Sequence, residues 1–404
     1  MNHENRGYWG DLLKRKKGEN MRLLLHNTGG IGFMTEERSR ETLTSEKLRK
    51  LCNEYKIDMV CLTEVNKDWR QVEQRHTIWN ATAMWRENRR VQAANNITKP
   101  STAEFQVGGT ATVAFDDWVF RITKQGSDIR LLGRWVWVTF TGKNNCNTTI
   151  ITCYCPVRGK STGSVYSQQL IYMAENKAHI PAETTCPRQL YGIDLKLLIE
   201  EKAGLGHQII VCGDFNSDYP ELQAWMLELN LEDLLSTKYG LGPRTYKRSK
   251  DSPIDCCFGS LSLKINRGGY LSFGRLHSDH RGVWIDIPAR LLLGYKPSPI
   301  TYFDARRLKL IDPRVVTKYQ IKLIQLCLHN NIFQKMDNLH RRTTHPMTPI
   351  LAEEYEAIDA VIEQLMEEAE KSVVNYEQER FHGRQHTKEY ASSYYTGRCE
   401  KIIR

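Results

Sequence analysis

The segment Gln208 to Tyr219, QIIVCGDFNSDY, constrains the fold more than any other stretch of the chain. It begins with an apolar run that ends in Gly213, which is typical of a buried strand. Asp214 and Asn216 follow two residues apart, and in a continued strand such positions point to the same side. A carboxylate and a carboxamide placed together at a strand end can hold a water, a metal ion or a phosphate oxygen. Taken alone, the segment fits an ordinary turn equally well, because Gly, Asp, Asn and Ser are turn formers.

The length and composition indicate a globular protein of one or two domains. The chain has 404 residues, of which 40% are hydrophobic and 26% are charged. No apolar run reaches the roughly 20 residues that a membrane span needs, and the first twenty residues lack the apolar region of a secretory signal. The eleven cysteines show no disulfide-like spacing. We therefore expect an intracellular protein, in the nucleus or the cytoplasm, that is neither secreted nor in a membrane.

The positive charge of the chain indicates a polyanionic partner. The net charge is +10 and the isoelectric point is about 9.0. Nucleic acid is the first expectation for such a chain. A basic protein without a polyanionic partner would show the same charge, so charge alone does not decide between the two.

The sequence divides into four parts. Residues 1–20 are polar and basic, and we expect them to be flexible. Residues 21–288 alternate short apolar strands with helical stretches, which predicts an α/β sandwich with antiparallel pairing. Residues 289–307 contain the sequence GYKPSP and are predicted to be a linker. Residues 308–404 have a helical pattern.

Apolar periodicity predicts the individual elements. Strands are predicted at Arg22 to His26, Met59 to Thr63, Gly108 to Phe115, Arg134 to Phe140, Thr149 to Tyr154, Ile254 to Phe258 and Val283 to Ile287. Helices are predicted at Ser45 to Tyr55 with Ser45 as N-cap, at Ser164 to Asn176, at Gln189 to Lys202 and at Leu222 to Asn230. Residues 70–106 are predicted to be irregular. Leu351, Tyr355, Ile358, Ile362 and Leu365 are spaced as on an amphipathic helix, so helix 350–375 is expected to pack on its own chain or, alternatively, to mediate self-association.

Polar residues recur at the ends of the predicted strands. Glu64 follows VCLT, Tyr154 ends TIITCY, and Asp255 opens a strand after a turn. Ser278-Asp279-His280 precedes GVWIDI. Each residue alone would be an ordinary surface or packing residue. If the strands share a sheet, however, these ends and Asp214 converge on one edge.

The order of these residues resembles the signature of the endonuclease/exonuclease/phosphatase superfamily, which has the deoxyribonuclease I-like fold. The resemblance rests on Asn27, Glu64, Tyr154, Asp214-Asn216, Asp255 and Ser278-Asp279-His280, with support from Gly108-Gly109-Thr110, Gly133-Arg134 and Pro243-x-Thr245-Tyr246. It covers roughly residues 20–288. It implies a four-layered α/β sandwich, with two packed mixed β-sheets flanked by helices, followed here by a C-terminal helical extension. Many members carry Asn or Asp two residues after the first Asn, where this chain has Gly29.

Within the superfamily, the segments most resemble the endonuclease of non-LTR (LINE-type) retrotransposons. The points of likeness are GDFNSDYPEL, the run from PRTY to SPIDCCFGS, and SDHRGVWIDI. This likeness implies a DNA endonuclease that nicks double-stranded target DNA for retrotransposition, with element RNA as a further candidate partner. No YxDD-like polymerase motif follows in the chain. A fragment, a degenerate copy and a domesticated endonuclease therefore all remain open.

The resemblance implies a divalent metal ion. Glu64 would hold the ion, and Asn27 and Asp279 would complete its inner or outer coordination. An oxygen-rich site of this kind suits Mg²⁺, with Mn²⁺ as a substitute.

The resemblance also implies the catalytic residues of a phosphodiester hydrolase. Asp214 would orient or deprotonate the attacking water, and Asn216 would fix Asp214 or the phosphate. His280, paired with Asp255, would polarise the phosphate, and Tyr154 would donate its phenol to the scissile phosphate. Whether the carboxylate or the histidine is the base stays open.

Several basic and aromatic residues are candidates for nucleic-acid contact, because Arg and Trp suit phosphate binding and base stacking. They are Trp79, Trp85, Arg86, Arg89, Arg90, Arg158, Lys247, Arg248 and Lys250. A solvated basic loop is an equally good interpretation for each of them.

Two other functions fit the same sequence. One is a phosphomonoesterase or a lipid phosphodiesterase on the same fold, because fold does not determine substrate. The other is a degenerate, non-catalytic copy that only binds nucleic acid.

Overall fold

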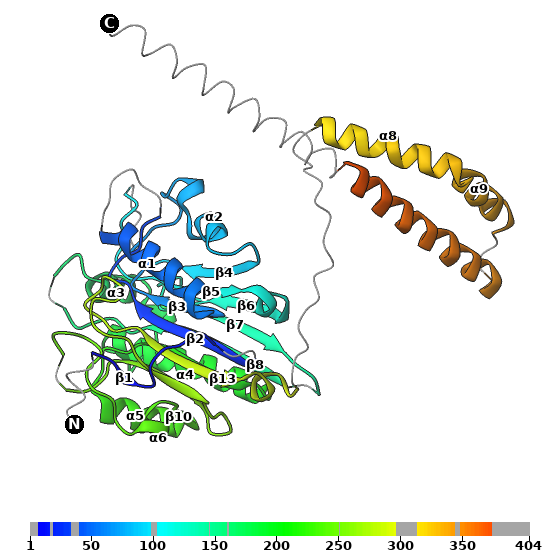
Figure 1. The fold of residues 1–404 in the computed structure, drawn as a ribbon. Helices are drawn as coiled ribbons and strands as arrows, with labels where there is room; N and C mark the ends of the chain where they lie inside the picture. Colours follow the sequence, from blue (N-terminus) through cyan, green and yellow to red (C-terminus); the bar gives the residue numbers. More distant parts are fainter. Residues whose placement is uncertain are drawn as a thin grey trace, which may run out of the picture. The chain divides into compact units, whose positions relative to one another are not determined.

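A computed structural model describes residues 7–16, 19–33, 40–97, 103–144, 146–159, 161–249, 251–295, 313–343 and 348–373 (Figure 1). The chain forms two compact units, Met1–Pro299 and Ile300–Arg404. Among the described residues, the first unit holds all the β-strands and the candidate catalytic and metal-binding residues. The described part of the second unit is helical.

The first unit contains a seven-stranded sheet with the order β1-β12-β13-β2-β3-β5-β4. The strands are β1 (Trp9–Gly10), β2 (Asn20–Asn27), β3 (Met59–Thr63), β4 (Arg89–Ala94), β5 (Thr110–Phe115), β12 (Arg267–Tyr270) and β13 (Val283–Pro288). Only β2 and β3 pair in parallel, so their carboxyl ends lie side by side at one edge of the sheet. The sheet is therefore mixed, with its parallel pair at the centre.

A six-stranded sheet with the order β10-β11-β9-β8-β7-β6 packs against the first. Its strands are β6 (Ile122–Ser127), β7 (Trp135–Thr141), β8 (Asn147–Tyr154), β9 (Gln208–Asp214), β10 (Leu231–Asp233) and β11 (Asp255–Ser260). Here β8 and β9 form the single parallel pair. Each sheet thus presents two parallel carboxyl ends.

Three apolar layers hold the unit together. The layer between the sheets joins residues such as Leu23 and Leu25 of β2 to Ile210 and Cys212 of β9. Helix α1 (Arg40–Tyr55) and helix α2 (Ile78–Ala81) cover the outer face of the seven-stranded sheet. Helix α4 (Pro187–Gly204) and helix α5 (Tyr219–Glu228) cover the outer face of the six-stranded sheet. The architecture is a four-layered α/β sandwich, so the predicted fold class is confirmed.

The remaining short elements lie in the connections. They are α3 (Val165–Glu175), α6 (Ser236–Tyr239), and the 3₁₀ turns η2 (Gln74–His76), η3 (Thr82–Met84), η4 (Asp116–Arg121) and η5 (Lys177–His179). Ser164 caps α3, since its side chain accepts a hydrogen bond from the backbone of Ser167. All cysteines in the described part of the chain are free thiols.

Some sequence-based predictions are wrong in detail. Helix α1 begins at Arg40, so Ser45 is not its N-cap and instead donates a hydrogen bond to the carbonyl of Thr42. The region 70–106, predicted to be irregular, contains the edge strand β4, whose arginines hid the strand pattern. The edge strand β6 was also missed, because after Ile122 its residues are polar or glycine and none of them is buried.

The two ends of the first unit also differ from the prediction. The described N-terminal residues are fastened to the domain rather than flexible, because β1 pairs with β12 and Trp9 packs on Tyr270. The segment predicted to begin the linker instead forms helix α7 (Ala289–Leu293). Leu292 and Leu293 of this helix are buried in the layer between the sheets.

The second unit contains α8 (Pro313–His329), α9 (Ile332–Arg342) and a helix over 349–373. They pack through an apolar cluster that includes Cys327, Leu339, Ile358 and Leu365. The predicted amphipathic helix is therefore present up to residue 373, and its role in self-association stays a prediction. No helix in the described ranges is long and apolar enough to span a membrane.

Candidate active site

Three site residues come from neighbouring strand ends of the six-stranded sheet. The strand register pairs Tyr154 at the end of β8 with Asp214 at the end of β9. It also pairs Asp214 with Asp255 at the start of β11. The side chains of all three residues are almost fully buried. Pairing thus places a phenol and two carboxylates in one row.

The seven-stranded sheet supplies the facing half of the site. Asn27 ends β2, and in the parallel register it lies beside Thr63, the residue before Glu64. The side-chain amide of Asn27 donates a hydrogen bond of 2.7 Å to Oδ2 of Asp214 on the other sheet. This bond joins the two sheets directly at the site.

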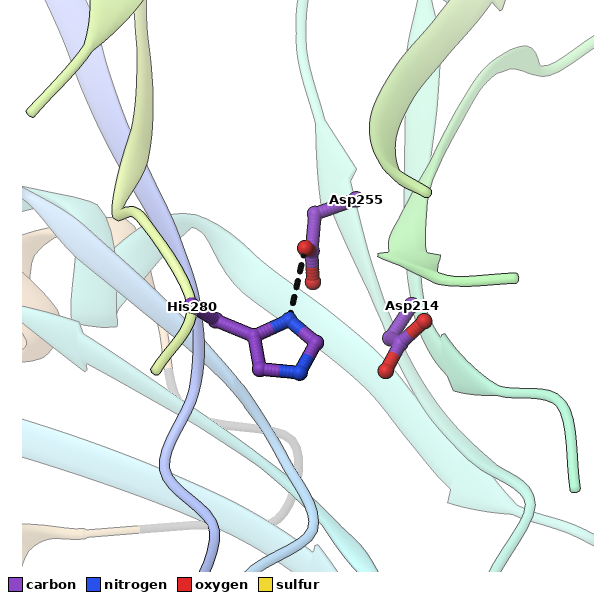
Figure 2. Close-up of side chains that lie close together, drawn as sticks. All are labelled: Asp214, Asp255 and His280. Atoms are coloured by element: carbon purple, nitrogen blue, oxygen red, sulfur yellow. Dashed lines mark hydrogen bonds and ion pairs between the residues drawn. The ribbon is translucent and has the colours of Figure 1, made fainter. Parts of the chain in front are cut away.

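A second link between the sheets is the contact of His280 with Asp255 (Figure 2). Nδ1 of His280 lies 2.8 Å from Oδ2 of Asp255, and both side chains are buried. Burial alone would lower the pKa of His280, but the Asp255 carboxylate outweighs it and raises the pKa to about 10. The ring is therefore an imidazolium at neutral pH. Its other nitrogen faces the Asp214 side chain in Figure 2.

The loop before β13 is held to the same place by Ser278. Its hydroxyl donates a hydrogen bond of 2.8 Å to the carbonyl of Asn27 and accepts one from the backbone N–H of His280. One small residue thereby ties the histidine to the end of β2.

Burial and neighbouring carboxylates disfavour the charge of Asp214. Burial raises the pKa of Asp214 well above its ordinary value, and the charge of Asp255 adds to the shift. Burial also raises the pKa of Tyr154 well above its ordinary value, with further contributions from Glu64 and Asp214. The phenol therefore stays protonated, and Asp214 holds its proton more tightly than an exposed aspartate.

Asn216 does not project beside Asp214 as in a continued strand. Strand β9 ends at Asp214, and Asn216 has a left-handed backbone with φ of +48°. Its backbone N–H donates to Oδ1 of Asp214, and its side-chain amide donates to the carbonyl of Cys155. The turn and the polar site are thus both present, and Asn216 holds the Asp214 carboxylate in place.

Two residues buttress the His280–Asp255 pair, although the sequence analysis gave them no role. The ring of Tyr246 stacks on the imidazole, with centroids 4.6 Å apart. The hydroxyl of Thr245 accepts hydrogen bonds from the backbone of Ile254 and Asp255. Nothing in one sequence marks such supporting residues except their membership of the PRTY segment.

The donor atoms of Asp214, Asp255 and His280 lie within 4.8 Å of one another. In the part of the chain that the structure describes, neither Glu64 nor Asp279 joins this tight group. Glu64 is close enough for its charge to raise the pKa of Tyr154, Asp214 and His280. Asp279 lines a cavity beside the site.

A sequence model of the endonuclease/exonuclease/phosphatase family matches residues 24–280, which include every strand end described above. The chain belongs to the endonuclease/exonuclease/phosphatase family. Members of this family are hydrolytic enzymes, among them nucleases and phosphatases, and they typically use divalent metal ions.

Solved structures that resemble the chain have low sequence identity to it. The catalytic domain of Xenopus laevis APE2 is 14% identical, with a TM-score of 0.45 over 66% of this chain and 92% of that chain. The human Nocturnin catalytic domain is 17% identical, with a TM-score of 0.45 over 66% of this chain and 94% of that chain. A mannosyl-6-phosphatase of Bacteroides thetaiotaomicron is 14% identical, with a TM-score of 0.43 over 66% of this chain and 99% of that chain. The comparison with curated proteins gave no match.

The site has the donor set that a hard divalent cation requires. Oδ1 of Asp255 is buried and, within the described residues, has no hydrogen-bond partner. The negative charge of Glu64 raises the pKa of Asp214, so the two carboxylates repel each other. A cation bound between them would relieve this repulsion. Carboxylate and carboxamide oxygens favour Mg²⁺ over softer metals. Nδ1 of His280 is held by Asp255, so this nitrogen is not available as a metal ligand.

Gly29 stands where many family members have Asn or Asp, and its backbone conformation explains why glycine suits this position. Its backbone is left-handed, with φ of +56°, a conformation that glycine adopts without strain. Its N–H donates a hydrogen bond of 2.9 Å to the side-chain oxygen of Asn27. The backbone of Gly29 thus orients Asn27.

Two of the predicted nucleic-acid contacts have structural roles instead. Trp85 is only 6% exposed and stacks on Phe115 behind the seven-stranded sheet. Arg86 forms an ion pair with Asp116 and donates a hydrogen bond to the carbonyl of Ile57. A basic stretch rich in aromatic residues is typical both of nucleic-acid binding and of structural packing. Here Trp85 packs in the core, and Arg86 is held by its ion pair and hydrogen bond.

The other candidates differ in how firmly they are held. Arg89 and Arg90 on β4 donate hydrogen bonds to nearby carbonyl groups, those of Trp79 and Ile122 among them. Trp79 is exposed and contacts the ring of Trp69 edge-on. The basic candidates that are exposed and form no ion pair with a described residue are Arg158, Lys247 and Arg248. Lys250 lies outside the described residues.

Proposed function

We propose that this family member is a Mg²⁺-dependent DNA endonuclease that nicks double-stranded target DNA, as the endonucleases of non-LTR retrotransposons do. The observation that supports this most is that His280, from the loop before β13 of the seven-stranded sheet, forms an ion pair with Asp255 beside Asp214 of the six-stranded sheet. It supplies a fixed positive charge and a carboxylate of raised pKa at one point, which phosphodiester hydrolysis needs.

Each polar group has a task in this proposal. Glu64 and the side-chain oxygen of Asn27 would hold the divalent ion, which supplies charge neutralisation at the phosphate. Asp214, oriented by the Asn27 amide, takes the proton of the attacking water. The imidazolium of His280 and the phenol of Tyr154 donate hydrogen bonds to the non-bridging oxygens as negative charge develops there.

The basic charge of the chain favours a nucleic-acid substrate over a lipid or a sugar phosphate. The likeness of GDFNSDYPEL and SDHRGVWIDI to retrotransposon endonucleases favours DNA. Element RNA is a further proposed partner.

Nicking of supercoiled plasmid tests the proposal. We expect the wild type to nick in Mg²⁺ and to stop in EDTA. Asp214→Ala and His280→Ala should each lower the rate by about 10³-fold, because acid–base groups acting as a unit contribute at this scale. Asp218→Ala is the matched control, since Asp218 is exposed four residues further along and its side chain caps no helix N–H.

Other outcomes would identify the alternatives. Phosphate release from inositol phosphates without nicking would indicate a phosphomonoesterase. A folded wild type that binds DNA and hydrolyses neither substrate would indicate a degenerate binding copy. Full activity of either site variant would remove the site assignment.

A further inference from the structure

A cavity of about 410 Å³ lies next to the catalytic candidates. It is lined by Lys247, Arg248, Gly274, His277, Ser278 and Asp279. Ser278 and Asp279 directly precede His280 in the chain, and Lys247 directly follows Tyr246, which stacks on His280. The cavity is therefore built on both sides of the residue that would contact the reacting phosphate.

The charge around this cavity is mostly positive and unpaired. Lys247 and Arg248 are exposed, and neither forms an ion pair with a described carboxylate. Asp279 is the one acidic side chain among the described lining residues. The two cations exceed it, so the cavity attracts an anion.

A further arginine adds to the positive field from behind. Arg281 is partly buried and lies 4.3 Å from the centre of the Phe273 ring, and Lys247 lies 5.9 Å from the same ring. Nε of Arg281 is buried without a hydrogen-bond partner in the described residues. Within the described residues, the guanidinium of Arg281 donates only a long hydrogen bond, 3.4 Å, to the carbonyl of Gly7. Partly buried arginine normally pairs with a carboxylate, and none of the described carboxylates pairs with this one.

Backbone hydrogen bonds fix this basic segment relative to the catalytic pair. The N–H of Lys247 donates to the carbonyl of Asp279 at 3.0 Å, and the N–H of Arg281 donates to the carbonyl of Thr245 at 2.7 Å. Tyr246 and His280 form the bridge between them. The cavity and His280 thus share one short two-stranded ladder and keep a constant separation.

We propose that this cavity is a second phosphate subsite, which binds a backbone phosphate of the DNA strand next to the phosphate that is cut. The inference rests on the proposed function and adds to it how a polymer is held. Lys247 and Arg248 contact the phosphate. Arg281, which packs on the Phe273 ring near Lys247, adds positive charge beside them. A substrate with a single phosphate has no second phosphate to place there, so the subsite favours a nucleic-acid chain over such a substrate.

The test is the salt dependence of DNA binding by the full chain in EDTA, where no cleavage occurs. Binding of a fluorescein-labelled duplex is followed by fluorescence anisotropy between about 50 and 300 mM KCl, a range that includes physiological salt. For Lys247→Ala/Arg248→Ala we expect the slope of log Kd against log salt to fall by about 0.9, and affinity near 100 mM salt to fall about tenfold, because one phosphate contact contributes about 0.9 to the slope. Lys247→Arg/Arg248→Lys should restore most of both.

The control is Lys177→Ala/Lys196→Ala, which removes the same charge from exposed positions on η5 and α4. It should leave the slope unchanged. An unchanged slope in the Lys247→Ala/Arg248→Ala variant, or an equal change in the control, would overturn the subsite.

The same samples separate this inference from the proposed activity. If the wild type nicks plasmid but the Lys247→Ala/Arg248→Ala variant binds DNA like the wild type, the subsite is wrong and the endonuclease activity stands. If the wild type binds DNA in a salt-dependent way that the variant weakens, but does not nick plasmid, the endonuclease activity is wrong and the phosphate subsite stands. Absence of salt-dependent binding in the wild type removes both.

Discussion

At the scale of single residues, the protonation of the site is governed by one contact. The carboxylate of Asp255 holds the pKa of His280 at about 10 although the ring is buried. The positive charge at the phosphate position is therefore present throughout the physiological range. It is lost only as the pH rises through the folded-state pKa of His280.

Asp255→Asn should move the alkaline limb of the activity profile. Without the carboxylate, only Asp214 and Glu64 still oppose the effect of burial, so the pKa of His280 falls below its value of about 10. We expect the rate to decline at a lower pH in the variant than in the wild type, where the decline begins only near pH 10. The measurement is the initial rate of plasmid nicking from pH 6 to 10, with exposed Asp251→Asn as the control. A variant whose limb stays near pH 10 would show that Asp255 does not set the charge.

The same pair links stability to pH. The folded-state pKa of His280 lies above the ordinary value, so its contribution is fully present below about pH 6.5 and disappears as pH rises to about 10. We expect the free energy of unfolding of the wild type to fall over this window, and Asp255→Asn to remove most of that slope. Urea unfolding at half-unit pH steps measures it. A slope that persists in Asp255→Asn would have to come from other groups.

Single residues were also where sequence reasoning reached its limit. Asp214 and Asp255 could be predicted to meet, because strand ends and motif order are written in the sequence. The stacking of Tyr246 on His280 and the burial of Trp85 could not, because both depend on where a long loop folds back. A tryptophan in a polar stretch looks the same in a sequence whether it faces DNA or Phe115.

At the scale of elements, the strands that are buried on both faces could be predicted from the sequence, and the exposed edge strands could not. Met59–Thr63 and Ile209–Val211 are central strands whose apolar runs identify them unambiguously. Strands β4 and β6 lie at sheet edges and carry Arg90, Lys124 and Gln125, so no alternation appears. The start of α1 was misplaced because residues 40–44 carry no apolar stripe that continues the one from Leu48.

Gly213 tests how tightly β8 and β9 are packed. A Cβ at this residue would lie 2.0 Å from the carbonyl oxygen of Cys153 on the neighbouring strand. Gly213→Ala should therefore destabilise the fold by more than about 2 kcal/mol and displace Asp214, since neither backbone can give way. Urea unfolding and the nicking rate give the two readouts.

Gly192→Ala is the matched control for Gly213→Ala. Gly192 lies within α4, and nothing lies within 4 Å of its added Cβ. Alanine there should stabilise the helix by about 0.5–1 kcal/mol. Equal effects of the two substitutions would contradict the packing at the parallel pair.

At the scale of the whole molecule, the first unit ends later than the composition change at Pro288 indicates. Leu292 and Leu293 of α7 are buried between the sheets. The carbonyl of Leu293 accepts a hydrogen bond from Lys143, and that of Leu292 accepts one from Thr148. Helix α7 belongs to the folded unit because it closes one end of the core.

Two truncations test this boundary. A chain of residues 1–299 should unfold cooperatively and keep the nicking activity, because every site residue and the sheet core lie within it. A chain of residues 1–288 should lose about 3–6 kcal/mol, from the burial of two leucine side chains. Thermal unfolding of both chains measures the difference. Equal melting temperatures would show that α7 does not stabilise the domain.

The Asn27–Asp214 and His280–Asp255 contacts, which join the sheets, have a consequence for the timing of activity during synthesis. Neither sheet alone carries a full set of reactive groups, and His280 precedes the last strand of the unit to leave the ribosome. A growing chain that has already formed most of its strands therefore still lacks a working centre. The candidate site is therefore complete only when both sheets of the first unit have been synthesised and paired.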